Sequence, residues 1–142
     1  MSASLLSLLH RANQIATESF HSAVGDTAMT ARQVQVLAAI EATDGPSQTT
    51  LVNMTGVDRS TLADIVKRLQ KNRLIERRRS KSDARAYVVR LTEAGKQALA
   101  SGMPALVSVE KNLLASLSAK ERSDCLASLS KMVEAHEARR RA

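Results

Sequence analysis

Two short helix-forming stretches separated by a glycine dominate the middle of this sequence. The first begins at Ser47 and carries apolar residues up to Met54, and Thr55-Gly56-Val57 then interrupts it with a glycine suited to a tight, left-handed turn. Asp58 is a typical N-cap residue, and a second helix is expected from about Arg59 to Asn72. This order of helix, tight turn and helix favours the helix-turn-helix class.

The second of these helices has two chemically different faces. At about 100° per residue, four large apolar side chains fall on one side; they are Leu62, Ile65, Val66 and Leu69. The opposite side is small and polar at its start and basic toward its end, and it holds Ser60, Ala63, Asp64, Lys67 and Lys71. In a helix-turn-helix the second helix enters the major groove of DNA, N-terminal residues first. The outward face is therefore the predicted DNA-reading surface.

The basic residues are concentrated in the same part of the chain. Between Asp58 and Arg90 the sequence has eleven Lys and Arg residues against four acidic ones, whereas the rest of the chain has ten of each. This window therefore carries the whole net charge of +7. A basic surplus confined to one quarter of a chain indicates an anionic partner. A solvated charged face is the alternative, but the charges fall on one helix and one predicted hairpin, which favours a binding site.

Two β-rich runs follow the basic helix. Residues 74–79 and 86–91 are separated by the polar stretch 80–85, and together they predict a β-hairpin. Lys81 and Arg85 lie at its expected tip, next to three consecutive arginines. A basic arm beside a recognition helix is placed to meet backbone phosphates and the adjacent minor groove. We interpret this hairpin as the wing of a winged helix-turn-helix.

The segments before the helix-turn-helix predict two more helices. Apolar residues from Leu5 to Phe20 recur at helical spacing, so the first helix is expected to end near Gly25. A further helix opens at Thr30, where Thr30 and Gln33 form a predicted capping box.

After the hairpin the chain is expected to be helical from Thr92 to about Arg139. The run Gly102-Met103-Pro104 predicts a kink or a break, and Ser118 with Glu121 predicts a second capping box. The apolar residues of this region exceed what two paired helices need for each other, and a partner subunit is the simplest cover for them. Packing on the N-terminal helix of the same chain is the alternative for some of them.

The expected fold is mainly α with a small β-hairpin wing, in one domain over 1–142. At this length the chain can bury one core. Residues 30–95 form the predicted winged helix-turn-helix lobe, and 1–25 with 96–142 form the predicted dimerisation region. The residues expected at the dimer contact are Leu5, Leu9, Leu113, Leu117, Leu126, Leu129 and Met132.

Several short motifs, in their order and spacing, resemble the multiple-antibiotic-resistance regulator family, known as MarR, over nearly the whole chain. They are Val57-Asp58-Arg59-Ser60-Thr61-Leu62, Leu69 to Arg77, Asp83-Ala84-Arg85 and Leu91-Thr92-Glu93-Ala94-Gly95, with Thr30 to Val34 upstream. The resemblance implies a triangular helical homodimer whose terminal helices interlock and whose two wings grip a pseudo-palindromic site on double-stranded DNA. It further implies a transcriptional repressor that a small-molecule effector or thiol oxidation releases.

The resemblance also implies roles for single residues. The major-groove candidates on the recognition helix are Ser60, Thr61, Asp64, Lys67 and Arg68, while Arg59 and Lys71 are expected to touch phosphate. In the wing, Arg85 resembles the arginine that the family places in the minor groove, Asp83 is expected to orient it, and Arg78 and Lys81 complete the set. Ser47, Gln48 and Thr49 open a helix, whose N-terminus favours anions, so they are expected to donate to backbone phosphates.

Enzymatic and metal-dependent functions find little support. The sequence has no phosphate-binding glycine loop, nucleophile motif or paired carboxylates in a defined context, so we expect neither catalysis nor a cofactor. His10, His21 and His136 lack the spacing of metal ligands, and no metal site is expected. Cys125 lies in the last helix beside Leu126 and is interpreted as a small buried hydrophobe.

The remaining alternative is a winged-helix module that binds protein or RNA without an operator, because the fold alone does not fix function. Phe20 and Tyr87 are the only aromatic residues, which argues against base stacking on single strands. No stretch reaches the roughly 18 apolar residues of a membrane span. We therefore expect no membrane partner and a cytoplasmic, nucleoid-associated protein.

Overall fold

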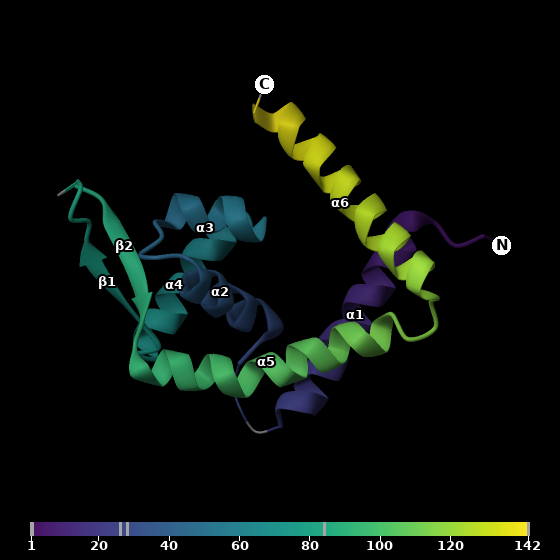
Figure 1. Ribbon diagram of the computed structural model, residues 1–142, viewed down its shortest axis with the longest axis horizontal. Helices are drawn as coiled ribbons and strands as arrows, with labels where there is room; N and C mark the ends of the chain where they lie inside the picture. Colours follow the sequence, from purple (N-terminus) through teal and green to yellow (C-terminus); the bar gives the residue numbers. More distant parts are fainter. Residues whose placement is uncertain (1, 26, 28, 84, 142) are drawn as a thin grey trace. The chain divides into compact units, whose positions relative to one another are not determined.

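The computed structural model describes residues 2–25, 27, 29–83 and 85–141 (Figure 1). Four helices are followed by a two-stranded antiparallel hairpin and two further helices. The chain forms two compact units, Met1–Val109 and Glu110–Ala142. The predicted class, mainly α with one small hairpin, is confirmed. None of the described helices is long and apolar enough to cross a membrane.

Each of the first two helices begins at an N-cap residue, and the one before the second helix was predicted. Helix α1 (Leu5–Val24) is capped by Ser4, and α2 (Ala31–Ala42) is capped by Thr30. The Thr30 hydroxyl accepts from the Gln33 backbone N–H at 3.1 Å, and the Gln33 Oε1 accepts from the Thr30 backbone N–H at 3.1 Å. This reciprocal pair satisfies two N–H groups that the first helical turn leaves unbonded, and it confirms the predicted capping box.

Helices α3 (Gln48–Thr55) and α4 (Arg59–Lys71) form the helix-turn-helix that the sequence predicts. The chain reverses at Gly56, whose φ of 70° lies in the left-handed region that glycine adopts without strain. Asp58 then caps α4, and its side chain accepts from the Thr61 backbone N–H at 3.0 Å. The two helices are therefore joined by a glycine turn and an aspartate cap, as predicted.

The hairpin consists of β1 (Ile75–Arg79) and β2 (Tyr87–Leu91), each one residue shorter at its start than the predicted runs. In the antiparallel register Ile75 faces Leu91 and Arg79 faces Tyr87. Strand β1 lies next to α4, and β2 lies next to α2 (Figure 1). The Val89 backbone N–H also donates to the Pro46 carbonyl at 3.0 Å, so the base of the hairpin is bonded to the loop between α2 and α3.

The main buried cluster joins α2, α3, α4 and the hairpin. Its buried members are Val36, Leu37, Ile40, Leu51, Val57, Leu62, Ile65, Val66, Leu69, Ile75 and Val89. All four inward residues predicted for α4 belong to it. Burial of these side chains fixes the rotation of α4, so its opposite face must point to solvent.

Helix α5 (Glu93–Leu113) runs through Pro104 without interruption, so a break at this position is the wrong alternative. A second cluster holds this turn of the helix, because Ala105 and Val109 are buried with Phe20 of α1 and Val34 of α2. Gly102 packs directly on the Val34 side chain, where a methyl group would not fit. The free energy gained by this packing on both sides of Pro104 thus compensates for the backbone hydrogen bond that proline cannot make.

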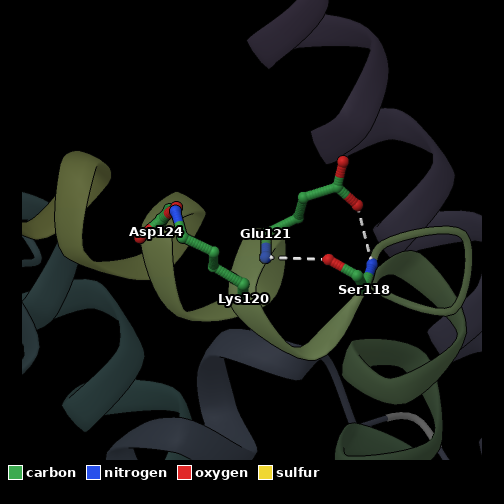
Figure 2. A network of polar contacts seen from close by, with 4 residues as sticks. All are labelled: Ser118, Lys120, Glu121 and Asp124. Atoms are coloured by element: carbon green, nitrogen blue, oxygen red, sulfur yellow. Dashed lines mark hydrogen bonds and ion pairs between the residues drawn. The ribbon is translucent and has the colours of Figure 1, made fainter.

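The second unit contains α6 (Ala119–Arg141), whose start is the predicted capping box. The Ser118 hydroxyl accepts from the Glu121 backbone N–H at 3.2 Å, and the Glu121 carboxylate accepts from the Ser118 backbone N–H at 2.7 Å (Figure 2). Lys120 and Asp124, which lie one turn apart on the same helix, form an ion pair of 2.9 Å (Figure 2). No described residue of α6 is fully buried, and most of its side chains are exposed in one chain.

Candidate nucleic-acid interface

The outward face of α4 presents most of the predicted DNA-reading side chains to solvent. Six of them are exposed, and Thr61 is half-buried. The exposed residues are Arg59, Ser60, Asp64, Lys67, Arg68 and Lys71. Because the buried residues of the same helix lie in the main cluster, these side chains share a surface that the fold holds in place. The structure therefore gathers the recognition-helix set on one side, as the periodicity predicts.

Hydrogen bonds at the start of α4 already engage two of these residues. The Ser60 hydroxyl donates to the Asp58 carboxylate at 2.8 Å, and Thr61 donates to the same carboxylate. The hydrogen bonds from the Thr61 side chain, then from its backbone, and from the Ser60 hydroxyl lower the pKa of Asp58 from 3.8 to about 2. Asp58 is therefore ionised throughout the physiological range, and the charge sits at the positive end of the helix dipole.

The predicted phosphate contacts at the starts of α3 and α4 lie together, whereas Lys71 lies at the other end of α4. The Arg59 guanidinium donates to the Thr49 hydroxyl at 3.4 Å, which links the first turn of α4 to the first turn of α3. Ser47 caps α3 and accepts from the Thr50 backbone N–H at 3.1 Å, so its hydroxyl is partly committed to the helix. Gln48 is half-buried and Thr49 is exposed. The two helix starts thus form one continuous donor-rich edge.

One face of the hairpin continues outward from the buried core as a basic surface. Side chains alternate between the faces of a strand, so Ile75, Arg77 and Arg79 share a face with Val89 and Tyr87 across the ladder. Ile75 and Val89 are buried, whereas Arg77, Arg79 and Tyr87 are exposed. The guanidinium carbons of Arg77 and Arg79 lie 4.8 Å and 5.9 Å from the centre of the Tyr87 ring. The inner half of this face therefore packs in the core with α2, α3 and α4, and its outer half presents two arginines and a tyrosine to solvent.

The opposite face of the hairpin is more nearly neutral. Arg78, a predicted wing contact, forms an ion pair of 2.6 Å with Glu76 on the same strand. Arg90 forms an ion pair of 2.9 Å with Asp44 in the loop between α2 and α3. Acidic partners thus offset part of the positive charge of this face. The Arg90–Asp44 ion pair also connects strand β2 of the wing to the loop between α2 and α3.

The tip of the wing carries the other predicted residues. Lys81, Asp83 and Arg85 are all exposed. The Asp83 carboxylate accepts from the Arg85 backbone N–H at 3.0 Å, so it shapes the turn from which the Arg85 side chain projects. This hydrogen bond is to the backbone of Arg85 and not to its guanidinium. That Asp83 orients the guanidinium of Arg85 therefore stays a prediction.

A tight turn connects the recognition helix to the wing. Arg73 has a φ of 60°, an unfavourable value for a side chain with a Cβ. Its carbonyl accepts from the Thr92 hydroxyl at 2.7 Å, and the Thr92 backbone N–H donates to the Leu74 carbonyl at 3.0 Å. Gly95 then packs so closely on the Leu74 carbonyl that a methyl group would collide with it. The start of α5 therefore holds the turn that positions both DNA-facing elements.

Arg77, Arg79 and Tyr87 are the candidates that the sequence analysis missed. The strand alternation contains the signal, because residues 75, 77 and 79 must share a face. Their neighbour across the ladder, however, depends on the register of the hairpin, and the length of the connecting turn sets that register. The register separates the three arginines, because Arg78, the one predicted as a wing contact, is the one paired with Glu76.

The cysteine and histidine residues do not form a site in the described part of the chain. Cys125 is a half-buried free thiol, so within one chain it is less buried than the prediction of a small buried hydrophobe requires. No group of three or more His, Cys, Asp or Glu side chains among the described residues could hold a metal ion.

Helix, glycine turn, outward basic helix and basic hairpin together define a winged helix-turn-helix protein. The MarR family profile matches residues 29–86. The HTH-type transcriptional repressor NicR from Pseudomonas putida is 32% identical over 130 residues, which cover 92% of this chain and 82% of NicR. The chain thus belongs to the MarR family of transcriptional regulators, which confirms the resemblance seen in the sequence.

Two solved structures are similar along most of their length. BpsR from Bordetella bronchiseptica, whose DNA binding is regulated by 6-hydroxynicotinic acid, has a TM-score of 0.85 and 26% identity, with 93% of this chain and 94% of BpsR covered. The transcriptional repressor CouR, bound to a 23-mer DNA duplex, has a TM-score of 0.78 and 28% identity, with 91% of this chain and 92% of CouR covered. The winged helix-turn-helix architecture is therefore confirmed.

Proposed function

We propose that this chain is a homodimeric, sequence-specific DNA-binding repressor that recognises a pseudo-palindromic operator. The observation that carries the proposal is the exposed polar and basic surface of α4 and of the wing, two elements that pack on one core. Two relatives support it, since NicR is a transcriptional repressor and CouR is seen on a DNA duplex. A module that only docks onto protein would have no need for this surface.

Each part of the surface has its own task in the proposal. Residues 30–95 form the DNA-binding lobe, with α4 in the major groove and Arg85 in the adjacent minor groove. Base edges are read by Ser60, Thr61, Asp64, Lys67 and Arg68, and phosphates are held by Ser47, Gln48, Thr49, Arg59, Lys71 and Lys81. Arg77 joins the phosphate contacts, and Arg78 contributes less than the sequence suggests because Glu76 already neutralises much of its charge.

Dimerisation is the second part of the proposal. Residues 1–25 and 96–142 supply the contact, and many of their apolar side chains are exposed within one chain. Five of the predicted contact residues are 38–57% exposed, an unusual state for large apolar side chains, namely Leu5, Leu9, Leu113, Leu126 and Met132. Leu117 and Leu129 are half-buried. A second copy would cover these side chains and place two recognition helices on one duplex.

A small-molecule effector completes the proposal, and the regulation of BpsR by 6-hydroxynicotinic acid supports it. The effector would bind the dimer and lower its affinity for the operator. We expect no catalytic activity, because a transcriptional regulator of this family acts by binding. Its place of action is the chromosome, and hence the bacterial cytoplasm.

The test is to select the preferred sequence from random duplexes and then measure its affinity at several salt concentrations. With about six or more phosphates neutralised, the slope of log K against log salt should be about −5 or steeper. Selection should yield a sequence with two related half-sites. A shallow slope with no enriched sequence would instead favour a protein-docking module, and preference for RNA over duplex DNA would favour an RNA-binding module.

A further inference from the structure

The first turn of the recognition helix holds a serine whose hydroxyl proton is already engaged. Ser60 is exposed on α4, and its Oγ donates to the Asp58 Oδ2 at 2.8 Å. The pKa of Asp58 is about 2, so at neutral pH its carboxylate is ionised and can only accept. A serine hydroxyl has one proton and two lone pairs. Ser60 therefore presents only an acceptor oxygen to a partner in the groove.

Asp58 is itself held in the position that receives this proton. Thr61 donates to the same carboxylate from its backbone N–H at 3.0 Å and also from its hydroxyl. The carboxylate belongs to the N-cap of α4, and the buried core fixes the rotation of this helix. The direction of the Ser60 hydrogen bond is therefore set before DNA binds.

Asp64 lies one turn further along the same exposed face. Positions i and i+4 of a helix are neighbours on its surface, so Ser60 and Asp64 lie next to each other. In the described part of the chain no basic side chain forms an ion pair with the Asp64 carboxylate. Phosphate repels a carboxylate, whereas the amino group of a base donates to it. An exposed acid on this basic helix is therefore suited to a base and not to the DNA backbone.

The other exposed side chains of α4 have the opposite polarity. Lys67, Arg68 and Lys71 carry only donors, which fit phosphate oxygens and the acceptor edge of guanine. Arg59 also belongs to the first turn, but its guanidinium donates to the Thr49 hydroxyl of α3 at 3.4 Å. The base-facing side chains of α4 thus accept hydrogen bonds in its first two turns and donate them in its last two.

Acceptors in the major groove distinguish bases by their exocyclic amino groups. Adenine presents its N6 amino group and cytosine its N4 amino group, whereas guanine and thymine present acceptors and, in thymine, a methyl group. Adenine also has the N7 lone pair beside its amino group, which repels a carboxylate, and cytosine has no acceptor there. A hydroxyl acceptor therefore suits adenine or cytosine, and a carboxylate suits cytosine best.

We propose that the first two turns of the recognition helix read base amino groups, with Ser60 accepting from adenine or cytosine and Asp64 accepting from cytosine. This inference rests on the proposed function and names the bases that one part of the surface selects. Each half-site should carry cytosine at the Asp64 position and adenine or cytosine at the Ser60 position, on the strand that these residues face. Guanine and thymine on that strand are disfavoured at both positions.

The first test compares the duplexes that variants select from random sequence. Asp64 is exposed, so its replacement leaves the core intact. Asp64→Ala should reduce the preference for a C·G pair at one position of each half-site from about fivefold or more to below about twofold. Asp64→Asn adds a donor beside the acceptor and should change that preference to A·T, because an amide matches adenine N6 and N7. An A·T preference of the wild type at this position would overturn the assignment.

A matched control removes the same charge elsewhere. Glu41→Gln lies at an exposed position of α2 and should select the wild-type sequence. If Glu41→Gln changes the selected bases as Asp64→Asn does, the effect comes from net charge and the assignment of Asp64 is wrong.

Modified bases identify the group that is read. N4-methylcytosine still pairs with guanine, but its methyl group replaces the amino hydrogen that faces the major groove. At the Asp64 position it should lower wild-type affinity by about fivefold or more, and that of Asp64→Ala by less than about twofold. 7-Deazaguanine in the same pair removes only the N7 acceptor and should leave wild-type affinity unchanged. Fluorescence anisotropy measures both, and weaker binding to 7-deazaguanine alone would overturn the proposal.

A change beside Ser60 tests why its hydroxyl accepts. Asp58→Gly keeps a residue that helix N-caps tolerate with a small loss of stability, but it removes the carboxylate that takes the Ser60 proton. Ser60 could then donate or accept, so the preference at its base pair should fall from about threefold or more to below about twofold. Ser60→Ala identifies this base pair, and the cytosine preference at the Asp64 position should remain. An unchanged preference at the Ser60 position in Asp58→Gly would refute the fixed polarity.

Failure of this inference and failure of the proposed function give different results. If the wild type selects two half-sites and changes at Ser60 and Asp64 leave the selected bases unaltered, reading by acceptors is wrong and the repressor proposal stands. If the wild type enriches no duplex sequence, the proposed function fails and this inference fails with it.

Discussion

The guanidinium carbon of Arg77 lies 4.8 Å from the centre of the Tyr87 ring, across the two strands of the wing. A cation over the face of an aromatic ring is attracted by the ring's quadrupole, and the contact also restricts a long, flexible side chain. Arg79 approaches the same ring at 5.9 Å. The single tyrosine of the chain therefore organises two arginines on one exposed face of the wing.

Replacement of this ring should weaken DNA binding without removing a charge. Tyr87→Ala is expected to lower the affinity for any duplex by about two- to fivefold, the equivalent of one exposed cation–π contact. The salt slope should stay the same, because the number of arginines is unchanged. Tyr87→Phe keeps the ring and serves as the matched control. Fluorescence anisotropy at several salt concentrations measures both quantities, and a normal affinity for Tyr87→Ala would remove the positioning role.

Neighbouring arginines on opposite faces of β1 should differ in their contribution. Arg77→Ala is expected to reduce the salt slope by about 0.9, the loss of one phosphate contact. Arg78→Ala should change it less, because Glu76 already pairs with that guanidinium at 2.6 Å. The same titrations compare the two variants with Arg85→Ala, which should weaken binding to all sequences. A larger effect of Arg78 than of Arg77 would reverse the assignment of the two faces.

The cap of the recognition helix should show a measurable pH dependence. The pKa of Asp58 is about 2 in the folded chain, and hydrogen bonds from Thr61 are the largest cause. Because the folded pKa is depressed, the stabilisation by this cap is present above about pH 4 and is lost as the pH falls toward 2. Thr61→Val removes the hydroxyl and should raise the pKa of Asp58 toward 3.8. A pH titration of the carboxyl group by NMR follows this shift, and an unchanged pKa would contradict the assigned cause.

Close packing at Gly95 should make the turn after the recognition helix sensitive to a single methyl group. Gly95→Ala forces the new Cβ against the Leu74 carbonyl, and such overpacking costs about 1–3 kcal/mol of unfolding free energy. Lys96→Ala, at the exposed neighbouring position, should be close to neutral. Urea unfolding of the two variants provides the comparison. Equal stability of Gly95→Ala and wild type would mean that the turn can shift to admit the methyl group without a loss of unfolding free energy.

Sequence patterns predict the structure correctly wherever a residue acts only on its own turn of the chain. Asp58, Gly56 and the Thr30–Gln33 pair act through their own turns, and the spacing of apolar residues in α4 fixed which face is exposed. Features that depend on distant partners could not be predicted. The continuity of α5 through Pro104 requires packing against Phe20 and Val34, which the local sequence does not specify.

The site shows the same division between local and distant causes. The recognition-helix residues follow from helical periodicity, whereas the Arg77–Tyr87 contact requires the strand register. A cavity of about 390 Å³ beside Gln33 is harder still to predict, because its walls come from four separate segments. A glutamine at a capping position is fully explained by its local role, and only the fold shows that its side chain is buried.

Two exposed apolar side chains of α6 lead to a last prediction, which concerns assembly. Leu126 and Met132 are 47% and 45% exposed within one chain, so a double change to Lys should leave the fold of the chain intact while it places two charges in the dimer contact. The variant should be monomeric by light scattering, and its affinity for a two-half-site operator should fall by about a hundredfold or more, because a dimer binds the second half-site at high effective concentration. Ala127→Lys, at an exposed position next to Leu126, tests whether added charge alone has this effect. A double variant that stays dimeric would move the contact away from this face of α6, and a monomer with full operator affinity would show that the two half-sites are not read by one assembly.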